Sequence, residues 1–353
     1  MSFFRISEII YTFNELVIIN QGCDIIFRRL NERGIHVMDS FEFEYGRVLE
    51  NVEVAYSTYG TPRYDDEGYI TNAVLFFSAF RGPYSFLRES HKYIMNNGDF
   101  TNDDFFFIVI APLGTPDSCS PSSTNLKFNF PNYTYFDLVE FQRQFLAEKF
   151  KIRKILGLVG ESYGAFHALI WACEYPDEME FIFVVNSSAK ISGYKYVISK
   201  ALENIIDAVD DYYSEEYSAS KTKSIVAINT LIFAHSASKT VFNKLPNAEI
   251  EAIWEDFIDE GLFMDIYDVK YKNDALMVYD IEDRLSNIKA KSLFVSTNDN
   301  YFCFESDMLP FKELVKDSIV LKQDFQKDDY YYKEEDYAPI GNHVISFLEQ
   351  VKK

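Results

Sequence analysis

The sequence predicts an α/β fold with a mostly parallel, doubly wound sheet and a helical insertion. Six apolar runs of strand length alternate with amphipathic helical stretches, and one long segment before the fifth run contains no such strand. Strands that are apolar on both faces are typical of parallel sheets covered by helices. Regular alternation of strands and helices is typical of a doubly wound arrangement.

The elements are justified in chain order. Residues 1–40 are amphipathic but poorly defined in pattern, and we expect a helical or mixed extension packed on the main domain. Residues 41–45 and 51–60 alternate polar and apolar side chains, as the strands of an antiparallel hairpin do. The continuously apolar strands are expected at residues 73–80, 105–112, 155–160, 181–188, 292–297 and 318–323, and helices between and after them at residues 136–150, 163–175 and 339–351.

These elements divide the chain into three parts. Residues 1–40 form the extension, and residues 41–189 together with 287–353 form the α/β core. Residues 190–286 are helical in pattern and rich in Ser, Asp, Tyr and Lys, so we expect a helical lid over one end of the sheet.

Composition limits the partners. The 353 residues include 34 Lys and Arg against 55 Asp and Glu, a net charge of −21. Binding to nucleic acid or to an anionic membrane needs clustered basic residues, so neither partner is expected. The residues show no metal-ligand spacing and no glycine-rich nucleotide loop, so no bound metal or cofactor is expected.

The spacing of the cysteines and the length of the apolar runs indicate the cellular compartment. The four cysteines lie far apart without a C-x-x-C pair, which favours free thiols in a reducing compartment. No apolar run has the length of a membrane span, and no cleavage site follows the N-terminal stretch. We therefore expect a cytoplasmic protein.

One motif carries chemistry. Gly160-Glu161-Ser162-Tyr163-Gly164 is a G-x-S-x-G sequence between a buried strand and an amphipathic helix. This is the context of the nucleophile elbow of α/β-hydrolases, in which a tight turn exposes the serine hydroxyl at the top of the sheet. We therefore predict Ser162 as a nucleophile, and the alternative is a turn without chemical function.

The partners of this serine follow from chain order. The oxyanion hole is expected to combine the N–H of Tyr163 with that of Phe80, which follows the first buried strand. Asp299 follows the fifth buried strand and is the candidate acid. The alternative for Asp299 is a turn or capping role within its Asn-Asp-Asn cluster.

The general base of the predicted triad has one candidate in the expected chain order. In α/β-hydrolases the histidine follows the acid in the chain, and His343 is the only histidine after Asp299. It lies inside the last predicted helix, so the alternative is a histidine on a helix surface. His167 lies on the apolar helix after Ser162 and is read as an interior or lid-facing side chain.

The ordered blocks of the chain resemble the homoserine O-acetyltransferase family of serine acyltransferases from about residue 40 to the C-terminus. The resemblance rests on LENVEVAYSTYGTP, NAVLFFSAFRG, APLGTPDSCSPSSTN, the long block around the elbow, two stretches of the lid, and LFVSTNDNYFCFE. It implies that Ser162 takes an acetyl group from acetyl-CoA and passes it to a hydroxyl acceptor, with Asp299 orienting the base. It also implies a homodimer that associates through the lid helices.

Three departures from the family pattern stand out. The elbow reads G-E-S-Y-G-A, where the family usually has G-G-S-M-G-G, so the mouth of the pocket is expected to differ. The lid segment that carries a substrate-binding Tyr-Arg pair in the family is shorter and reads His235 to Lys239, which leaves Lys239 or Arg81 to bind a substrate carboxylate. The family's triad histidine is replaced by Lys327-Asp328-Asp329-Tyr330.

The missing histidine leaves three interpretations. The first is a serine acyltransferase or related esterase whose base comes from elsewhere, with His343 first and His167 or His91 as alternatives. The second is a catalytically impaired descendant that binds a small ligand or a protein partner. The third is direct acid–base chemistry by Asp328, Asp329 and a tyrosine of residues 330–332. Loss of a triad histidine typically costs about 10⁶ in kcat, so the choice decides whether the protein is an enzyme.

Overall fold

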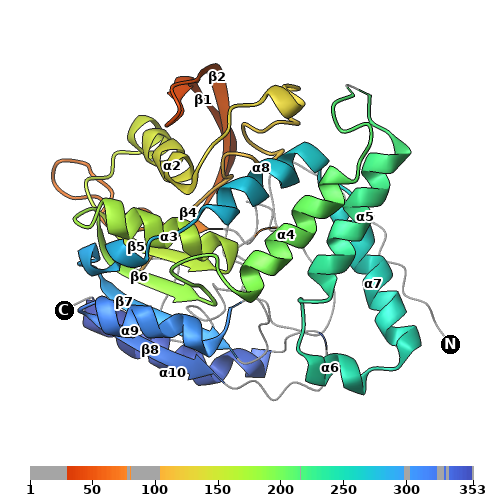
Figure 1. Cartoon of the computed structure of the whole chain (residues 1–353). Helices are drawn as coiled ribbons and strands as arrows, with labels where there is room; N and C mark the ends of the chain where they lie inside the picture. Colours follow the sequence, from red (N-terminus) through yellow and green to blue (C-terminus); the bar gives the residue numbers. More distant parts are fainter. Residues whose placement is uncertain are drawn as a thin grey trace.

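The computed structural model describes residues 30–77, 80, 104–214, 216–297, 303–323, 330 and 334–351. Figure 1 shows one mixed sheet with helices on both faces and a group of helices beside its edge. The strands are β1 Leu30–Glu42, β2 Val48–Tyr59, β3 Ala73–Phe77, β4 Phe106–Ile110, β5 Ile155–Glu161, β6 Met179–Val185, β7 Lys291–Thr297 and β8 Ser318–Gln323. The longer helices are α2 Tyr135–Lys149, α3 Tyr163–Glu174, α4 Tyr194–Asp207, α5 Ala219–Phe233, α7 Asn247–Gly261, α8 Ile266–Met277 and α10 Glu334–Val351.

The described strands form one sheet in the order β1-β2-β4-β3-β5-β6-β7-β8. The strands β1, β2 and β4 are antiparallel neighbours. From β4 through β3, β5, β6 and β7 to β8 every neighbouring pair is parallel. Parallel pairing places the carboxyl ends of these strands at one edge of the sheet, which is where α/β proteins bind ligands.

Both faces of the sheet are buried, as the continuous apolar runs predict. In β3, Leu75 and Phe77 point to one face, whereas Val74 and Phe76 point to the other. The first face is covered by α2 and α3, and the second is covered by α10. The period of two therefore holds within a strand whose residues are all apolar.

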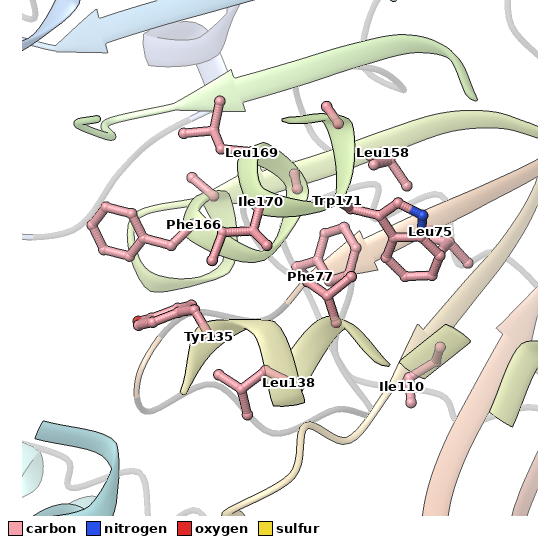
Figure 2. Close-up of a cluster of buried hydrophobic side chains, with 14 of the residues drawn as sticks. Leu75, Phe77, Ile110, Tyr135, Leu138, Leu158, Phe166, Leu169, Ile170 and Trp171 are labelled. Carbon is pink, nitrogen blue, oxygen red and sulfur yellow. The ribbon is translucent and has the colours of Figure 1, made fainter. Parts of the chain in front are cut away.

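The first face contains most of the core. Side chains of α3, among them Phe166 and Trp171, pack between the strands and α2, as Figure 2 shows. Helix α2 begins with a capping box, in which Thr134 accepts a hydrogen bond from the Phe136 N–H and Asp137 accepts one from the Thr134 N–H. Such a box satisfies N–H groups that a helix start otherwise leaves without partners.

The lid lies between β6 and β7 and consists in its described part of α4, α5, the short α6 Lys239–Lys244, α7 and α8. It has a core of its own, in which residues of α4, α5 and α8 pack together. Lys221 is fully buried in it, and its ammonium donates to the carbonyls of Ser214 and Glu216 and to the Tyr267 hydroxyl. These three acceptors compensate the loss of water around a buried charge.

The structure confirms the predicted α/β fold and its six apolar strands, each within a few residues. The helical character predicted for residues 190–286 also agrees with α4 to α8. One boundary differs, because β1 begins at Leu30 and residues 30–40 are therefore part of the sheet rather than of an extension. Residues 30–42 alternate weakly in hydrophobicity, since β1 is an edge strand with exposed side chains such as Ile35 and Val37.

Among the helices that the structure describes, none combines the length and the apolar character of a bilayer-spanning segment. Three cysteines, Cys119, Cys173 and Cys303, are buried free thiols. Burial raises the pKa of Cys119 and of Cys173 to about 12. These side chains therefore pack as small apolar groups rather than as reactive thiolates.

The core of α3 can be tested by truncation. Phe166 is fully buried, with its ring 4.5 Å from the ring of Tyr279. We expect Phe166→Ala to lower the free energy of unfolding by about 3–5 kcal/mol, because apolar area is lost and a cavity remains. Urea denaturation followed by circular dichroism measures the change. The control is Tyr45→Ala, which removes a ring that is 67% exposed and should change stability by less than about 0.5 kcal/mol.

Candidate active site

Ser162 lies at the tip of a sharp turn between β5 and α3. Its φ of 52° and ψ of −117° are outside the regions that residues with a side chain prefer. A β-carbon on Gly160 would lie 2.5 Å from the carbonyl oxygen of Gly164, so strand and helix approach too closely for any other residue. The backbone strain, about 1–3 kcal/mol for such a conformation, is held by the packing around it.

Backbone hydrogen bonds fix the serine in this conformation. The Ser162 N–H donates to the Val185 carbonyl at 2.9 Å, and the Ser162 carbonyl accepts from the Ala165 N–H at 3.1 Å. The Ser162 hydroxyl makes no capping bond to α3 although it occupies the N-cap position. Within the described residues this side chain therefore has no structural capping role, and Ser162 is half-buried at the carboxyl ends of the parallel strands.

The two residues predicted for the oxyanion hole lie together. Tyr163 is the first residue of α3, and the ring of Phe80 packs edge-on against its ring at 5.3 Å. The bulky side chain of Tyr163, which distinguishes this elbow from the family pattern, is buried. It is 4% exposed and packs in the core with Tyr135 and His167. The backbone N–H of Tyr163 thus remains at the free start of the helix.

The segment with Asp299 lies outside the described residues, but the strand that leads into it is well fixed. Thr297, the last residue of β7, is held by the side chain of Asn186, which follows β6. The Asn186 Oδ1 accepts from the Thr297 N–H at 2.8 Å, and its Nδ2 donates to Thr297 Oγ1 at 2.9 Å. Asn186 adopts a φ of 52°, a conformation that asparagine tolerates better than most residues.

The described chain after this segment is fixed to the lid. Lys195 of α4 forms an ion pair of 2.7 Å with Asp307, and the Lys195 side chain is only 3% exposed. Asp307 lies in η3, Glu305–Met308, a few residues after Asp299. An ion pair with one partner this buried is geometrically demanding, so it fixes the chain after the predicted acid, as Asn186 fixes the strand before it.

The sheet order fixes the spacing of the strands that lead to Ser162 and to the predicted Asp299. Glu161, Val185 and Val295 lie side by side across β5, β6 and β7. Neighbouring strands are about 4.8 Å apart, so residues that follow β5 and β7 leave the sheet about 10 Å apart. A histidine ring between a serine and an aspartate spans a gap of this order.

Neither described histidine candidate for the base lies against Ser162. His167 is fully buried beside Phe77 and Tyr135, as the interior reading predicts. Burial, with a smaller effect of the Lys272 charge, lowers the pKa of His167 to about 3. His343 is exposed on α10, which covers the sheet face opposite α3, and it lies about 14 Å along the helix from its start.

The other predicted site residues lie in the lid, after β8 or outside the described residues. Lys239 begins α6 and is exposed. His235 bridges two elements of the lid, with its Nε2 at 2.8 Å from the Tyr194 hydroxyl and its Nδ1 at 2.7 Å from the Leu231 carbonyl. Tyr330 follows β8 and its hydroxyl lies 2.8 Å from the Ser236 hydroxyl, also in the lid. Predictions that fall on Arg81, His91, Asp328, Asp329 and residues 331–332 lie outside the described residues.

Sequence reasoning missed Asn186 and Lys195. Asn186 directly follows a buried strand, and an asparagine at a strand end is a signal for positive φ. Lys195 gives no such signal, because lysine in a helix is normally exposed. Its burial follows from the packing of the lid on the segment after β7.

Comparison with known proteins agrees with this geometry. A family model described as alpha/beta hydrolase fold matches residues 72–302. The chain is 37% identical to a probable acyltransferase of Methanothermobacter thermautotrophicus over 88% of its length and 96% of that protein. It is 27% identical to a homoserine O-acetyltransferase of Pasteurella multocida, over 84% of this chain and 90% of that one.

A solved structure shares the fold. An acetylester hydrolase from Corynebacterium glutamicum superposes with a TM-score of 0.77 at 20% identity, covering 90% of this chain and 96% of that one. The chain belongs to the alpha/beta hydrolase fold family. Within that family it is a divergent relative of the acyltransferases and homoserine O-acetyltransferases, as the resemblance in the sequence implied.

The Asn186 contact to β7 can be tested directly. We expect Asn186→Ala to lower the free energy of unfolding by about 2–4 kcal/mol, because buried groups of Thr297 lose their partner and alanine is strained at positive φ. Asn186→Gly should lose about 1 kcal/mol less, because glycine accepts that backbone conformation. Chemical denaturation measures both variants. Asn204→Ala, on the exposed side of α4, is the control, and an equal loss in all three variants would contradict the prediction.

Proposed function

We propose that the chain is a serine acyltransferase, or a related esterase, that works through an acyl-Ser162 intermediate. The observation that carries the proposal is the strained turn at Ser162. A serine in this conformation, with Gly160 required for the close approach of β5 and α3, serves no capping function and is costly to maintain. Retention of such strain is typical of a catalytic nucleophile.

The proposed reaction has two steps. In the first, Ser162 Oγ attacks the carbonyl carbon of an acyl donor and loses its proton to the base. The base passes this proton to the donor's leaving group, which departs, and the acyl group remains on Ser162. In the second, the hydroxyl of an acceptor attacks the acyl-serine, the ester is released and Ser162 regains its proton. The oxyanion of each tetrahedral intermediate is placed near the N–H groups of Tyr163 and Phe80. Asp299 is the proposed acid that orients the base.

The proposed donor is acetyl-CoA, used as a co-substrate rather than as a bound cofactor. In that case the bond that breaks in the first step is the thioester C–S bond, and coenzyme A leaves as a thiol. The support is the similarity to an acyltransferase and to homoserine O-acetyltransferases. The proposed acceptor is a small molecule with a free hydroxyl, and the esterase alternative uses water in its place.

The nucleophile can be tested without knowing either substrate. A fluorophosphonate phosphonylates an activated serine, with fluoride as the leaving group. We expect intact-mass spectrometry to show one adduct on the wild type and none on Ser162→Ala. Ser346→Ala removes an exposed serine of α10 and should label like the wild type. Folded wild-type protein that gains no adduct would exclude the proposed mechanism.

One observation favours a second function. No histidine lies between Asp299 and His343, and His343 is exposed on α10. A catalytically impaired protein that binds a small ligand or a protein partner under the lid is therefore the alternative. It predicts a folded wild type without a fluorophosphonate adduct. If the adduct forms, His343→Ala tests the base, because loss of a true triad histidine should slow labelling at least about 10³-fold.

We further infer that the protein acts in the cytoplasm and associates as a homodimer through the lid. The buried free thiols support a reducing compartment. The lid supports association because apolar side chains are exposed on it, which is typical of interaction surfaces. These side chains are Tyr194, Tyr196, Val197, Tyr213, Tyr217, Leu262, Phe263 and Val278.

A charged substitution in the lid tests the proposed dimer. We expect Phe263→Glu to shift the sedimentation coefficient from that of a dimer to that of a monomer, because a carboxylate in an apolar interface loses its hydration. Ile35→Glu is the matched control, since Ile35 is similarly exposed but lies on β1, away from the lid. A wild type that sediments as a monomer at all concentrations would contradict the inference.

A further inference from the structure

Helix α8 of the lid carries two buried ionisable residues that the proposed reaction does not use. Asp268 and Lys272 are one helical turn apart, and they are 3% and 8% exposed. Buried charges are costly unless other groups compensate them, so their contacts indicate what maintains them. Each of the two contacts a different loop at the carboxyl edge of the sheet.

Asp268 contacts the loop that follows β4. Its Oδ1 accepts from the Ser122 N–H at 2.9 Å, and its Oδ2 accepts from the Ser122 hydroxyl at 2.5 Å. That loop is ordered by its own hydrogen bonds, including one of 2.6 Å from the Ser123 hydroxyl to the Ser118 carbonyl. Burial raises the pKa of Asp268 to about 6, so the carboxylate remains mostly ionised at pH 7.5.

Lys272 contacts the residues of the proposed oxyanion hole. Its Nζ lies 3.5 Å from the Phe80 carbonyl oxygen, 5.3 Å from the centroid of the Phe80 ring and 6.0 Å from that of Tyr163. One ammonium group thus engages Phe80 through both its carbonyl and its ring, while lying close to Tyr163. Both kinds of contact favour a positive charge at this position.

The charge of Lys272 persists at neutral pH. Burial lowers its pKa to about 8, and the carboxylates of Asp268 and Asp117 oppose that effect. About nine-tenths of the amine is therefore protonated at pH 7. The neighbouring His167 is neutral at that pH, since its pKa lies at about 3.

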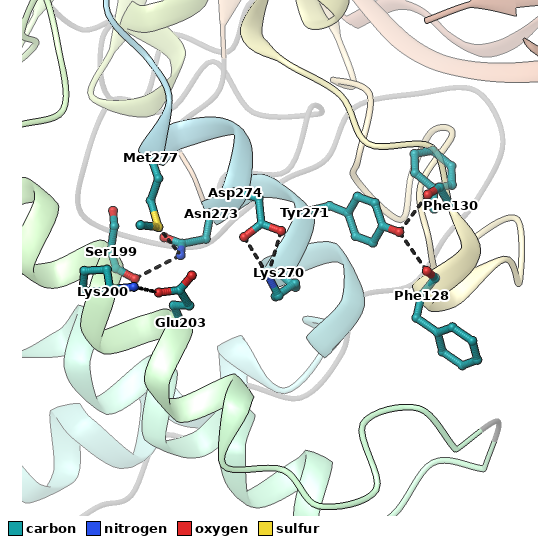
Figure 3. A network of polar contacts seen from close by, with 10 residues as sticks. All are labelled: Phe128, Phe130, Ser199, Lys200, Glu203, Lys270, Tyr271, Asn273, Asp274 and Met277. Carbon is teal, nitrogen blue, oxygen red and sulfur yellow. Dashed lines mark hydrogen bonds and ion pairs between the residues drawn. The ribbon is translucent and has the colours of Figure 1, made fainter. Parts of the chain in front are cut away.

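The helix that carries Lys272 is itself firmly held. Asn273 donates to the Ser199 carbonyl of α4 at 3.0 Å. The Tyr271 hydroxyl donates to the carbonyls of Phe128 and Phe130, at 3.1 and 2.7 Å (Figure 3). Both neighbours of Lys272 in the sequence make these bonds. The packing of the lid therefore fixes the position from which the Lys272 side chain contacts Phe80.

We propose that Lys272 is a positioning residue that fixes Phe80 of the proposed oxyanion hole from the lid. By holding the Phe80 carbonyl and ring, it orients the residue whose N–H faces the oxyanion. The inference rests on the proposed serine chemistry and adds a residue to it. Under this proposal the lid also positions catalytic groups. The same helix, α8, holds Phe80 through Lys272 and the loop after β4 through Asp268.

The activity test compares Lys272→Met with Lys270→Met, using p-nitrophenyl acetate as the acyl donor. Lys270 lies on the same helix and pairs with Asp274 at 2.8 Å, also four residues apart, but on the partly exposed side (Figure 3). Loss of a direct oxyanion donor costs about 10²–10³ in kcat. We expect Lys272→Met to lower kcat about 10- to 100-fold with KM within threefold, and Lys272→Arg to recover part of the loss. Lys270→Met should stay within twofold of the wild type, and an unchanged kcat in folded Lys272→Met would overturn the proposal.

A second measurement does not depend on catalysis. Protein labelled with ¹³C′-Phe and ¹⁵N-Arg gives correlated signals only from Phe-Arg pairs, of which the sequence has three, at residues 4–5, 27–28 and 80–81. We expect Lys272→Met to shift one of these carbonyl signals and Lys270→Met to shift none. Three unchanged signals would overturn the proposal even if the wild type is an efficient esterase. One shifted signal in a protein that gains no fluorophosphonate adduct would refute the proposed function. It would still confirm that Lys272 contacts Phe80.

Thermal unfolding guards against misfolded variants. If Lys272→Met does not fold, Lys272→Gln replaces it in both measurements, because glutamine keeps a donor of similar length without the charge. We expect folded Lys272→Gln to have a lower kcat than the wild type, because the charge is missing. It should also shift the same Phe-Arg signal. Wild-type values in both measurements for a folded Lys272→Gln would overturn the role of the charge.

Discussion

The close approach of β5 and α3 is the constraint on which the site depends. The backbone of Gly164 lies where a side chain on Gly160 would be, and the turn between them has room only for a residue at positive φ. That residue is Ser162. Its position therefore results from the packing of a central strand against the most buried helix, both of which belong to the main core. The energy that holds the serine in a strained conformation comes from that core.

The groups around the serine are held in a similar way by elements on both sides. Asn186 ties the end of β6 to the end of β7, and Lys195 ties α4 to the segment after β7. The rings of Tyr163 and Phe80, the two residues of the predicted oxyanion hole, pack against each other. Contacts between separate elements thus lie beside Phe80 and Tyr163 and on both sides of the segment with Asp299. A site whose groups come from separate loops needs such cross-links to keep its geometry.

Much of the fold and part of the site could be predicted from the sequence. The buried parallel strands have a strong signal because a sheet covered on both faces needs continuous apolar runs. Ser162 was predictable because its motif requires small residues at fixed positions next to a strand and a helix. The start of β1 was not, since an edge strand such as the one with Ile35 and Val37 lacks a clear apolar face. The buried lysines Lys195 and Lys272 were also missed, because their burial depends on how the lid packs on loops far away in the sequence.

The place of the lid in the chain has a consequence for folding. Asn186 and Thr297 are 111 residues apart in the sequence, and the whole lid lies between them. The pairing of β6 with β7 therefore closes a very long loop, whose entropic cost falls once the lid has formed its own apolar cluster. On a ribosome the first strands can pair long before β7 emerges. The half-built sheet would then expose one edge of β6 until β7 has been made and paired with it. This edge is therefore the point where a nascent chain is most open to aggregation and to chaperones.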